Sequence, residues 1–506
     1  MTTDPAGTPD HETARLAEAL AIAVAPSLGF DAVRVEGLHR LSGGASRETW
    51  GFEAVEVVEI VEIVEDERTA DPVEDATPER HRLIFQRTRP GPALTGPSMA
   101  TEDRLLAAAI EAGVPVPPVV VDAATAAGRL GEGRVTRHVD GETLGPRIVR
   151  HERYVTARSA LTDQCARALA AIHSIDPMAV GGLETVEPLQ RLRVGFDQMD
   201  EHRPTFELAL RWLDAHRPPP SVLAVVHGDF RLGNLIVDES GLRAVLDWEL
   251  AHLGDPLEDL GWLCVRSWRF GGAGEVAGVG RLEELIAAYA AARGEPVDPE
   301  AVRWWIAVGT LTWGLICAVQ ARRHLDGHVR SVELATIGRR VCETEYDLLG
   351  LLGIDATEPT DAPSAPPKYA ASNGDDAGSA AAPRDLHGRP TAAELVDAVR
   401  GHLEDLGQPG GDRTNAFQTK VAGNALAMVE RELRLGPAMM IAHQDRLRTL
   451  GYHQEAALAD AIRTAPAHTR GPADRADVRA AICASVVDRL RVANPRWLLG
   501  TDRDQC

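Results

Sequence analysis

The sequence predicts an α+β protein in which a two-lobed unit is followed by a separate all-α domain. Strand-like segments and a glycine-rich turn gather between residues 29 and 139, and helical patterns dominate from 140 to 354. Residues 356–388 are mainly Pro, Ala, Ser, Gly and Asp, a composition typical of a disordered linker. We therefore expect a two-lobed arrangement: an N-terminal helix (1–28), a small antiparallel β lobe (29–139) with an acidic insert (53–80), and an α-rich lobe (140–354). A linker (355–388) and an all-helical domain (389–506) follow.

The small lobe is predicted to open with an amphipathic helix over residues 11–26. Two strands separated by a glycine-containing turn follow it, and a third strand comes after the insert. The strands are expected at 31–38, 47–52 and 81–87, and the turn between the first two at Ser42, Gly43 and Gly44.

The insert at 53–80 contains eleven acidic residues and two arginines, a net charge of −9. Five of its glutamates recur at every third position, a period that fits neither a half-buried strand nor an amphipathic helix. We expect a long hairpin extension or a mobile loop between the second and third strands. An acidic wall for a cationic substrate is the alternative.

A helix is expected over residues 99–112, and the segment around 136–139 is expected to join the two lobes. The α-rich lobe should contain helices at 151–175, 206–217, 280–293, 299–325 and 330–352. In the last domain Gly407, Gly436 and Gly451 are expected to end helices. Its predicted helices are 391–406, 412–435, 438–450, 453–465 and 474–492.

Composition and charge restrict the class of protein. With 506 residues, of which 44% are hydrophobic, the chain can bury more than one core. No uninterrupted apolar run approaches the roughly 18 residues of a membrane span, and the N-terminal residues do not resemble a signal peptide, so we expect a cytoplasmic protein without a membrane partner. The six cysteines have no metal-ligand spacing, and the net charge of −22 argues against binding to nucleic acid.

The most informative segment is VHGDFRLGNLIVDESGLRAVLDWELAHLGDP, residues 226–256. His227, Asp229 and Asn234 form an HxDxxxxN pattern, and Asp247 follows an apolar run as the first residue of a DWE triplet. Transfer of a phosphoryl group from Mg-ATP needs a carboxylate near the attacking hydroxyl and oxygen ligands for the metal. Asp229, Asn234 and Asp247 are residues of those types.

These motifs resemble those of the aminoglycoside phosphotransferase and choline kinase-like family, which shares the protein-kinase fold. HGDFRLGNLIV, DWELAHLGDPLEDLGW and the upstream LSGGASRETW look most like the kinase-like domain of acyl-CoA dehydrogenase family members ten and eleven. The resemblance covers roughly residues 30–352. The last domain resembles a helical domain of unknown function that accompanies kinases of this group.

The chemistry and the resemblance together assign roles to the catalytic segment. Asp229 is expected to accept or orient the proton of the substrate hydroxyl, and Asn234 and Asp247 to bind Mg²⁺ through oxygen. His227 is expected to brace the loop rather than to transfer protons. Arg231 either steadies a γ-phosphate or an anionic substrate, or forms a surface ion pair.

Asp259 is expected to accept hydrogen bonds that fix the backbone of the catalytic loop. In kinases the turn that corresponds to Ser42, Gly43 and Gly44 lies over the nucleotide phosphates. The segment from Thr136 to Val139, which includes His138, is expected to meet the adenine.

The only lysines are Lys368 and Lys420, although kinases ordinarily place a lysine on the third strand against the α- and β-phosphates. An arginine can hold phosphate and carboxylate oxygens through its planar fork. We therefore expect Arg87 to take this role with Glu102 as its partner, and Arg89 to be the second choice.

The resemblance implies an ATP-dependent O-phosphotransferase of a small hydroxylated molecule. A hydroxyacyl-CoA or hydroxy acid is the first acceptor to test, because the related domains accompany acyl-CoA dehydrogenases, and a partner from such a pathway is implied. The alternatives are an antibiotic or amino-alcohol kinase, and a nucleotide-binding pseudokinase scaffold. The sequence does not predict an oligomeric state.

Overall fold

The computed structural model describes residues 11–41, 47–57, 78–88, 96–354, 386–407, 416–466 and 471–499. The chain forms two compact units, each assembled from more than one segment. Unit 1 comprises Met1–Val186 and Pro220–Val297, and unit 2 comprises Glu187–Pro219 and Asp298–Cys506.

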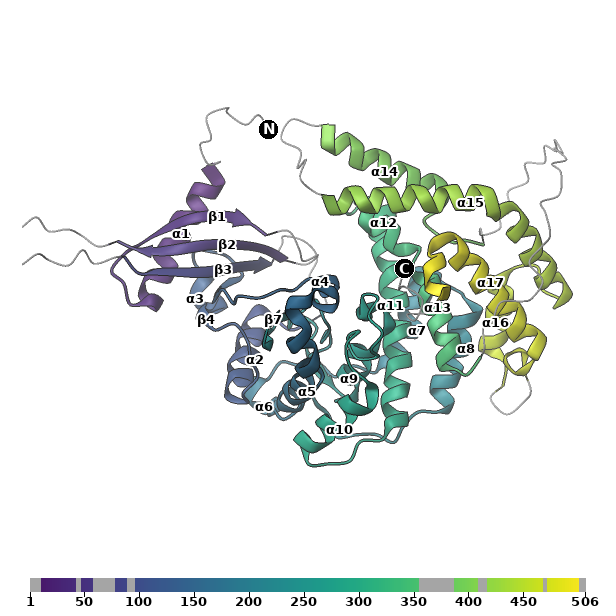
Figure 1. Ribbon diagram of the computed structural model, residues 1–506, viewed down its shortest axis with the longest axis horizontal. Helices are drawn as coiled ribbons and strands as arrows, with labels where there is room; N and C mark the ends of the chain where they lie inside the picture. Colours follow the sequence, from purple (N-terminus) through teal and green to yellow (C-terminus); the bar gives the residue numbers. More distant parts are fainter. Residues whose placement is uncertain are drawn as a thin grey trace, which may run out of the picture. The chain divides into compact units, whose positions relative to one another are not determined.

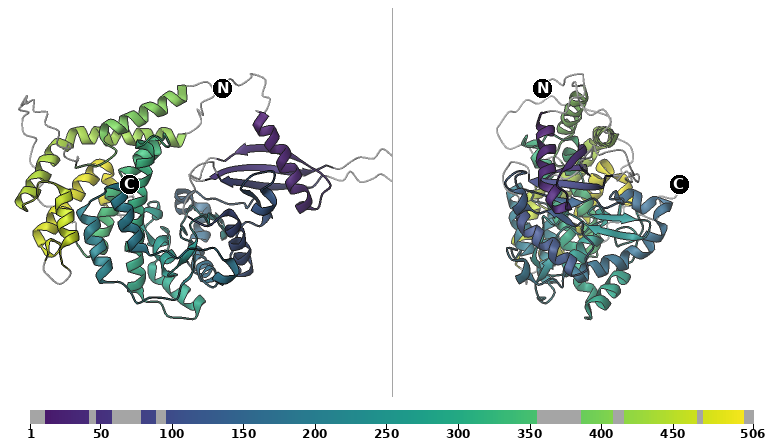
Figure 2. Two further views of the ribbon diagram at one scale, coloured as in Figure 1. Left: turned by 180° about the vertical axis from the view of Figure 1, so that it is seen from behind. Right: turned by 90° about the vertical axis from the view of Figure 1, so that its left-hand side faces the viewer.

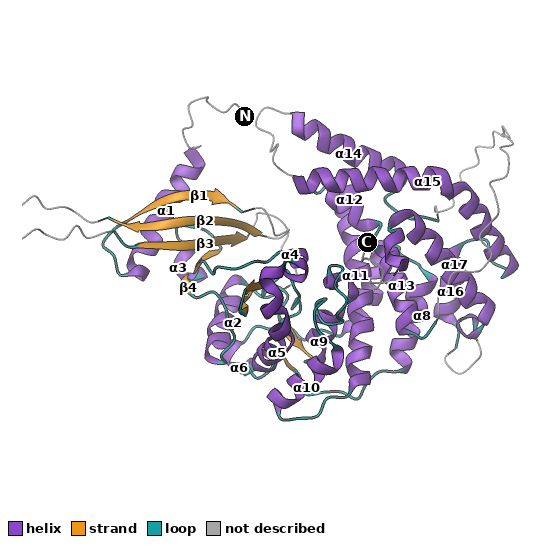
Figure 3. Ribbon diagram, in the orientation of Figure 1, coloured by secondary structure: helices purple, strands orange, loops and turns teal. Residues whose placement is uncertain are grey.

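Unit 1 begins with an antiparallel sheet whose strand order is β1-β2-β3-β5-β4 (Figures 1 and 3). The predicted strands at 31–38, 47–52 and 81–87 are confirmed with small shifts of their ends. The strands are β1 Val33–Arg40, β2 Arg47–Glu56, β3 Arg80–Thr88, β4 Val119–Val121 and β5 Gly133–Arg137. Most of the insert between β2 and β3 lies outside the described residues, as do Ser42, Gly43 and Gly44.

Helix α1 (His11–Leu28) covers one face of this sheet (Figure 2). Its Leu20 and Val24 share a buried cluster with Leu83 and Phe85 of β3. Because side chains alternate between the two faces of a strand, Arg87 has the same parity as Leu83 and Phe85. The residues between them belong to the opposite face of the sheet.

The rest of unit 1 positions residues 226–256. The predicted helix at 99–112 is α2 (Met99–Glu111), which starts where the Ser98 side chain accepts the Thr101 N–H. Two short antiparallel pairs, β6 with β9 and β7 with β8, carry the HxDxxxxN loop and the DWE triplet. The remaining elements are α3 Ala123–Ala126, α4 Gly145–Arg150, η1 Glu152–Tyr154, α5 Val155–Ile172, α6 Pro177–Val180, β6 Ala224–Val226, β7 Leu235–Asp238, β8 Gly241–Val245, β9 His252–Gly254, α9 Leu257–Cys264, η2 Arg266–Arg269 and α10 Leu282–Arg293.

Unit 2 is helical throughout its described residues (Figure 3). One described helix, α11, is long and apolar enough to cross a bilayer, but 72% of its most apolar window is buried, as in a core helix. The elements are α7 Pro188–Met199, α8 Pro204–Ala215, α11 Pro299–Leu325, α12 Val332–Gly338, α13 Val341–Leu351, α14 Ala392–Gly407, α15 Ala416–Thr449, α16 Glu455–Thr464, η3 Pro472–Asp474, α17 Ala476–Ala493 and η4 Pro495–Leu499.

The helices after residue 388 do not form a unit of their own, which differs from the expected division of the chain. Leu208 of α8 and Leu349 of α13 share one apolar cluster with Leu458 of α16 and Val486 of α17. The buried carboxylate of Glu345 accepts hydrogen bonds from Arg489 at 3.0 and 3.2 Å. Apolar burial and a buried ion pair therefore join the last helices to the helices that precede residue 354.

Two predictions of helix ends are wrong. Gly436 and Pro437 lie inside the continuous helix α15, although proline removes one backbone hydrogen bond from a helix. Buried Met428 and Leu447, one on each side of Pro437, pack in different clusters and stabilise both halves. The single helix expected at 330–352 is divided into α12 and α13, where Gly338 packs so closely on α11 that a Cβ would lie 2.5 Å from Ala321.

Candidate active site

His227 anchors the loop that follows β6. Its ring is fully buried, its Nδ1 accepts the N–H of Asp229 at 3.2 Å, and its Nε2 lies 3.0 Å from the Leu246 carbonyl. Since Nδ1 accepts, Nε2 carries the proton and donates it to Leu246. Burial lowers the pKa of His227, which keeps the ring neutral. These contacts make His227 a brace of the loop.

Asp259 holds the same loop from α9. Its carboxylate accepts the N–H groups of His227 and Gly228 at 2.8 and 2.9 Å, and it lies 3.1 Å from Nε2 of His173. Burial opposes the charge of Asp259, but these hydrogen bonds and the neighbouring histidines hold its pKa below the ordinary value. Gly228 has a φ of +80°, and a Cβ there would lie 2.4 Å from the Leu250 carbonyl oxygen, so only glycine fits.

Asp229 is oriented by three donors. Its Oδ1 accepts hydrogen bonds from Nε of Arg231 at 2.9 Å and from Nε1 of Trp262 at 2.8 Å. Its Oδ2 accepts Nδ2 of Asn234 at 2.6 Å, and the same amide nitrogen donates to the Asp229 carbonyl at 3.0 Å. Because the amide nitrogen faces Asp229, the amide oxygen of Asn234 points away and can bind a metal ion.

Arg231 lies against an aromatic pair. Its guanidinium carbon is 4.7 Å from the centre of the Trp268 ring, and the Trp262 and Trp268 rings are 5.2 Å apart. Such stacking leaves the edge of the guanidinium able to bond to an anion. Arg231 does form an ion pair, but its partner is Asp229 of the same loop, and both side chains are only partly exposed. Its contact with a phosphate or an anionic substrate stays a prediction.

The β7–β8 hairpin brings Asn234 and Asp247 together. Leu235 pairs with Val245, and the Leu246 N–H donates to the Asn234 carbonyl at 2.8 Å, so Asp247 follows one residue beyond this bond. Asp247 has a φ of +66°, a left-handed conformation that is uncommon outside glycine. The surrounding protein, and then the charges of Glu249 and Asp229, raise the pKa of Asp247 to about 7.

A carboxylate that other carboxylates repel is a favourable position for a cation, and Asn234 supplies a neutral oxygen beside it. Magnesium usually takes one or two protein ligands and completes its shell with phosphate oxygens and water. Among the described residues no group of three or more His, Cys, Asp or Glu side chains has the geometry of a metal site. The pair Asn234 and Asp247 therefore fits a metal that is bound together with a nucleotide.

The expected pairing of Glu102 with Arg87 is wrong. Glu102 is fully buried and binds Arg47 of β2, whose Nη1 donates at 2.8 Å, and also Arg134 of β5. Arg87 bonds instead to Glu48 through Nε at 2.6 Å. The parity of β3 explains the difference, since Arg87 belongs to the face that α1 covers and Glu102 lies against the other face.

Thr136 is buried on β5 two residues after Arg134, and so it shares a face with Arg134. The N–H of His138 donates to the Arg82 carbonyl at 2.9 Å. Burial, together with the charge of Arg82, lowers the pKa of His138. The contact of this segment with adenine stays a prediction, as does the role of Ser42, Gly43 and Gly44, which lie outside the described residues.

Sequence reasoning missed Arg47, Arg134, Trp262 and Trp268. A usable signal existed for Arg47, because the alternation in HRLIFQR places Arg87 on the face of Leu83 and Phe85. No comparable signal identified the two tryptophans, since their contact with the loop depends on how α9 and η2 fold back on it.

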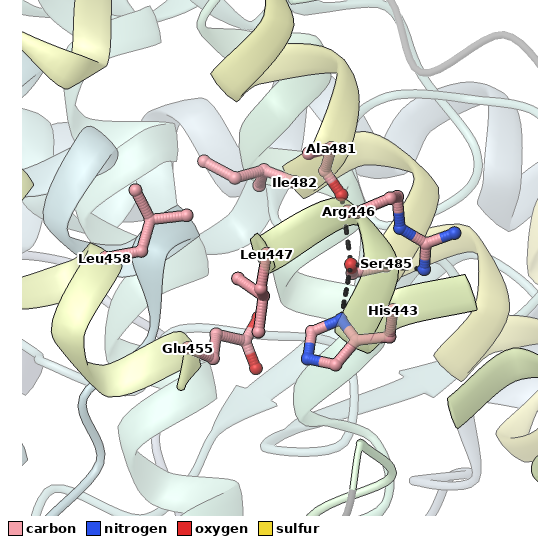
Figure 4. A pocket seen from close by; sticks show the side chains of 8 residues that line it. All are labelled: His443, Arg446, Leu447, Glu455, Leu458, Ala481, Ile482 and Ser485. Atoms are coloured by element: carbon pink, nitrogen blue, oxygen red, sulfur yellow. Dashed lines mark hydrogen bonds between the residues drawn. The ribbon is translucent and has the colours of Figure 1, made fainter. Parts of the chain in front are cut away.

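A histidine and a serine also meet in unit 2, around a cavity of about 10 Å³ (Figure 4). His443 Nδ1 lies 2.9 Å from Ser485 Oγ, and Oγ donates to the Ala481 carbonyl at 2.9 Å. Because the hydroxyl proton is committed to the helix, His443 must donate to Ser485 and cannot activate it. Burial lowers the pKa of His443 to about 4. The cavity holds about one water molecule, and the pair is structural.

Comparison with known proteins gives two family matches. Residues 61–305 match the phosphotransferase enzyme family, and residues 409–497 match a domain of unknown function, DUF6285. The first match contains the HxDxxxxN loop and the DWE triplet. The second falls within the last helices of unit 2.

Curated relatives include acyl-CoA dehydrogenase family member 10 of Mus musculus, 45% identical over 64 residues, and family member 11 of Rattus norvegicus, 30% identical over 174 residues. The matches cover 12% and 29% of this chain, but only 6% and 21% of those proteins. Among solved structures, a Ralstonia eutropha protein classed as an aminoglycoside phosphotransferase is 20% identical with a TM-score of 0.49, over 66% of this chain and 98% of that one. Residues 61–305, which contain the site built around Asp229, are thus the part of the chain that matches the phosphotransferase enzyme family.

Proposed function

We propose that the protein transfers the γ-phosphoryl group of ATP, with Mg²⁺, to a hydroxyl group of a small molecule. The orientation of Asp229 by Asn234, Arg231 and Trp262 is the observation that carries this proposal. Phosphoryl transfer depends mainly on positioning and electrostatics, and a carboxylate fixed by three donors is suited to hold an attacking hydroxyl.

The reaction joins the acceptor oxygen to the γ-phosphorus and breaks the bond between that phosphorus and the β–γ bridging oxygen. Asp229 orients the hydroxyl and receives its proton, and ADP leaves with the bridging oxygen. Asn234 and Asp247 would hold the metal, which when bound neutralises charge on the phosphates. Arg231 adds a positive charge beside Asp229, where the transferred group carries negative charge.

We propose a hydroxyacyl-CoA or hydroxy acid as the acceptor. Arg231, stacked on Trp268 next to Asp229, supports an anionic acceptor because its guanidinium edge attracts carboxylate or phosphate oxygens. The relatives named acyl-CoA dehydrogenases support an acyl-CoA derivative. A cationic acceptor such as an aminoglycoside would be repelled by Arg231 at short range.

The test is a panel in which purified protein is incubated with Mg-ATP and hydroxyacyl-CoAs, hydroxy acids, aminoglycosides, macrolides or amino alcohols. Phosphorylated product is detected by mass and compared with ADP release. Asp229→Asn protein is the control, because it should bind nucleotide and form product roughly 10² to 10⁴ times more slowly. Phosphorylation of an aminoglycoside or amino alcohol alone would refute the anionic acceptor. Nucleotide binding without any phosphorylated product would indicate a pseudokinase.

A further inference from the structure

We infer that Arg47 of β2 replaces the third-strand lysine of kinases as the cation that contacts the nucleotide phosphates. The inference rests on the proposed function, since it assigns a residue to the nucleotide that the reaction would use. The phosphotransferase domain, residues 61–305, contains no lysine, because Lys368 and Lys420 both follow it.

Arg47 occupies the required face of the sheet. It is the first residue of β2 and pairs in register with Thr88 at the end of β3. Gln86, two residues before Thr88, pairs with both Thr49 and Arg134, so all these residues share one face. That face meets the buried carboxylate of Glu102, which binds Arg47 and Arg134.

Arg47 also connects helix α2 with the metal-binding triplet. Its Nε lies 3.6 Å from the Glu249 carboxylate, two residues after Asp247, while its two terminal nitrogens bind Glu102. The Arg47 side chain is 13% exposed and Glu102 is fully buried, so the pair is held in place while the arginine keeps some contact with solvent. A kinase lysine likewise pairs with a helix glutamate, and it also contacts the phosphates near the metal, the contact that we infer for Arg47.

Arginine is able to perform both functions at once. A guanidinium has five N–H groups, and Glu102 takes one from each terminal nitrogen of Arg47, while Nε faces Glu249. Each terminal nitrogen therefore keeps a second N–H that can donate to a phosphate oxygen. A lysine ammonium has three N–H groups that rotate freely about the terminal bond, so the planar guanidinium of arginine offers the more fixed geometry.

Arg87 provides a matched control. It is an arginine in the strand next to β2, but its side chain lies on the sheet face opposite to that of Arg47 and bonds to Glu48 instead of Glu102. Gln86 provides a rescue, because a lysine at this position would stand on β3 beside Arg134, where kinases ordinarily carry it.

The experiment measures the affinities for Mg-ADP and for adenosine by titration calorimetry. The proteins are the wild type, Arg47→Gln, Arg47→Ala, Arg87→Ala and the double variant Arg47→Ala with Gln86→Lys. Charge-assisted hydrogen bonds to phosphate predict that Arg47→Gln and Arg47→Ala weaken Mg-ADP binding by about ten- to a hundredfold. Adenosine has no phosphate, so its affinity should change by less than about twofold. Arg87→Ala should behave as the wild type, and Gln86→Lys should recover at least part of the lost Mg-ADP affinity.

Three outcomes overturn the inference. Wild-type affinity of Arg47→Gln for Mg-ADP would show that Arg47 does not contact phosphate. An equal loss of adenosine and Mg-ADP affinity would show that Arg47 only supports the fold. Arg47→Gln keeps most of the side chain, so the test remains valid if Arg47→Ala misfolds. Failure of the wild type itself to bind Mg-ADP would refute the proposed function and, with it, this inference. Binding by the wild type with no loss in Arg47→Gln would refute this inference alone.

Discussion

Replacing Asp247 by asparagine should stabilise the metal-free protein at neutral pH and abolish its stabilisation by Mg-ADP. Surrounding protein and the charges of Glu249 and Asp229 raise the pKa of Asp247 from 3.8 to about 7. An unfolded chain releases this proton near pH 3.9. Between these pH values the folded protein binds more protons than the unfolded chain, so the free energy of unfolding falls as the pH rises from about 4 to about 7.

The size of the effect follows from the shift. A change from 3.8 to about 7 corresponds to about 4 kcal/mol when nothing screens the carboxylate. Asp247 keeps an exposed surface, so solvent screens much of the repulsion, and about 1 to 2 kcal/mol is the expected loss. Asparagine has no charge to repel, so Asp247→Asn should recover that amount at pH 7.

Thermal or urea unfolding at pH 5, 6, 7 and 8, in EDTA and in Mg-ADP, measures both effects. The control is Glu239→Gln, which neutralises an exposed carboxylate in the same hairpin, one that pairs with Arg153. Parallel pH profiles of Asp247→Asn and the wild type in EDTA would refute the raised pKa. Equal stabilisation of both proteins by Mg-ADP would refute Asp247 as a metal ligand.

Three further predictions concern the catalytic loop and the division of the chain. Asp229→Asn should lower kcat by roughly 10² to 10⁴ with the Mg-ADP affinity nearly unchanged, as steady-state kinetics and calorimetry would show, and a wild-type kcat would disprove the assignment. Trp262→Phe removes one donor to Asp229 while it keeps the ring, so kcat should fall by about tenfold with a smaller change in KM; a larger effect on KM would place Trp262 in substrate binding instead. A protease site inserted after Pro367 should give two pieces that stay together in gel filtration, because exposing side chains such as Leu349 and Val486 costs about 1.5 to 3 kcal/mol each; separation into two soluble pieces would contradict the shared core.

The proximity of Asp229, Asn234 and Asp247 was predictable from the sequence, because the contacts that bring them together are local. Asp229 and Asn234 are five positions apart, and the β7–β8 hairpin that brings Asn234 towards Asp247 has only two residues between its strands. The helices and strands of the small lobe were also predictable, since their apolar periodicity is strong. The alternation in HRLIFQR could have excluded Arg87 as the partner of Glu102, but the choice of Arg47 and Arg134 depends on which face of the sheet meets α2.

Contacts between distant segments could not be predicted from periodicity. Glu345 and Arg489 are 144 positions apart, and nothing in either segment specifies the other. The apolar faces of α16 and α17 predicted that these helices are buried against something. Packing within a small separate domain would bury them as well as packing against α8 and α13 does. The helix end predicted at Gly436 was wrong for a related reason. Packing on both sides of Gly436 and Pro437 overcomes their local tendency to break a helix.

The central claim is that Asp229 presents a hydroxyl acceptor to the γ-phosphate of ATP. It is tested most directly by incubating the protein with Mg-ATP labelled on the γ-phosphate and a hydroxyacyl-CoA, and by following the label into product. The account predicts labelled phosphoester with the wild type, label transfer slower by roughly 10² to 10⁴ with Asp229→Asn, and nearly equal Mg-ADP affinity in both proteins. Label transfer by Asp229→Asn at the wild-type rate would contradict it.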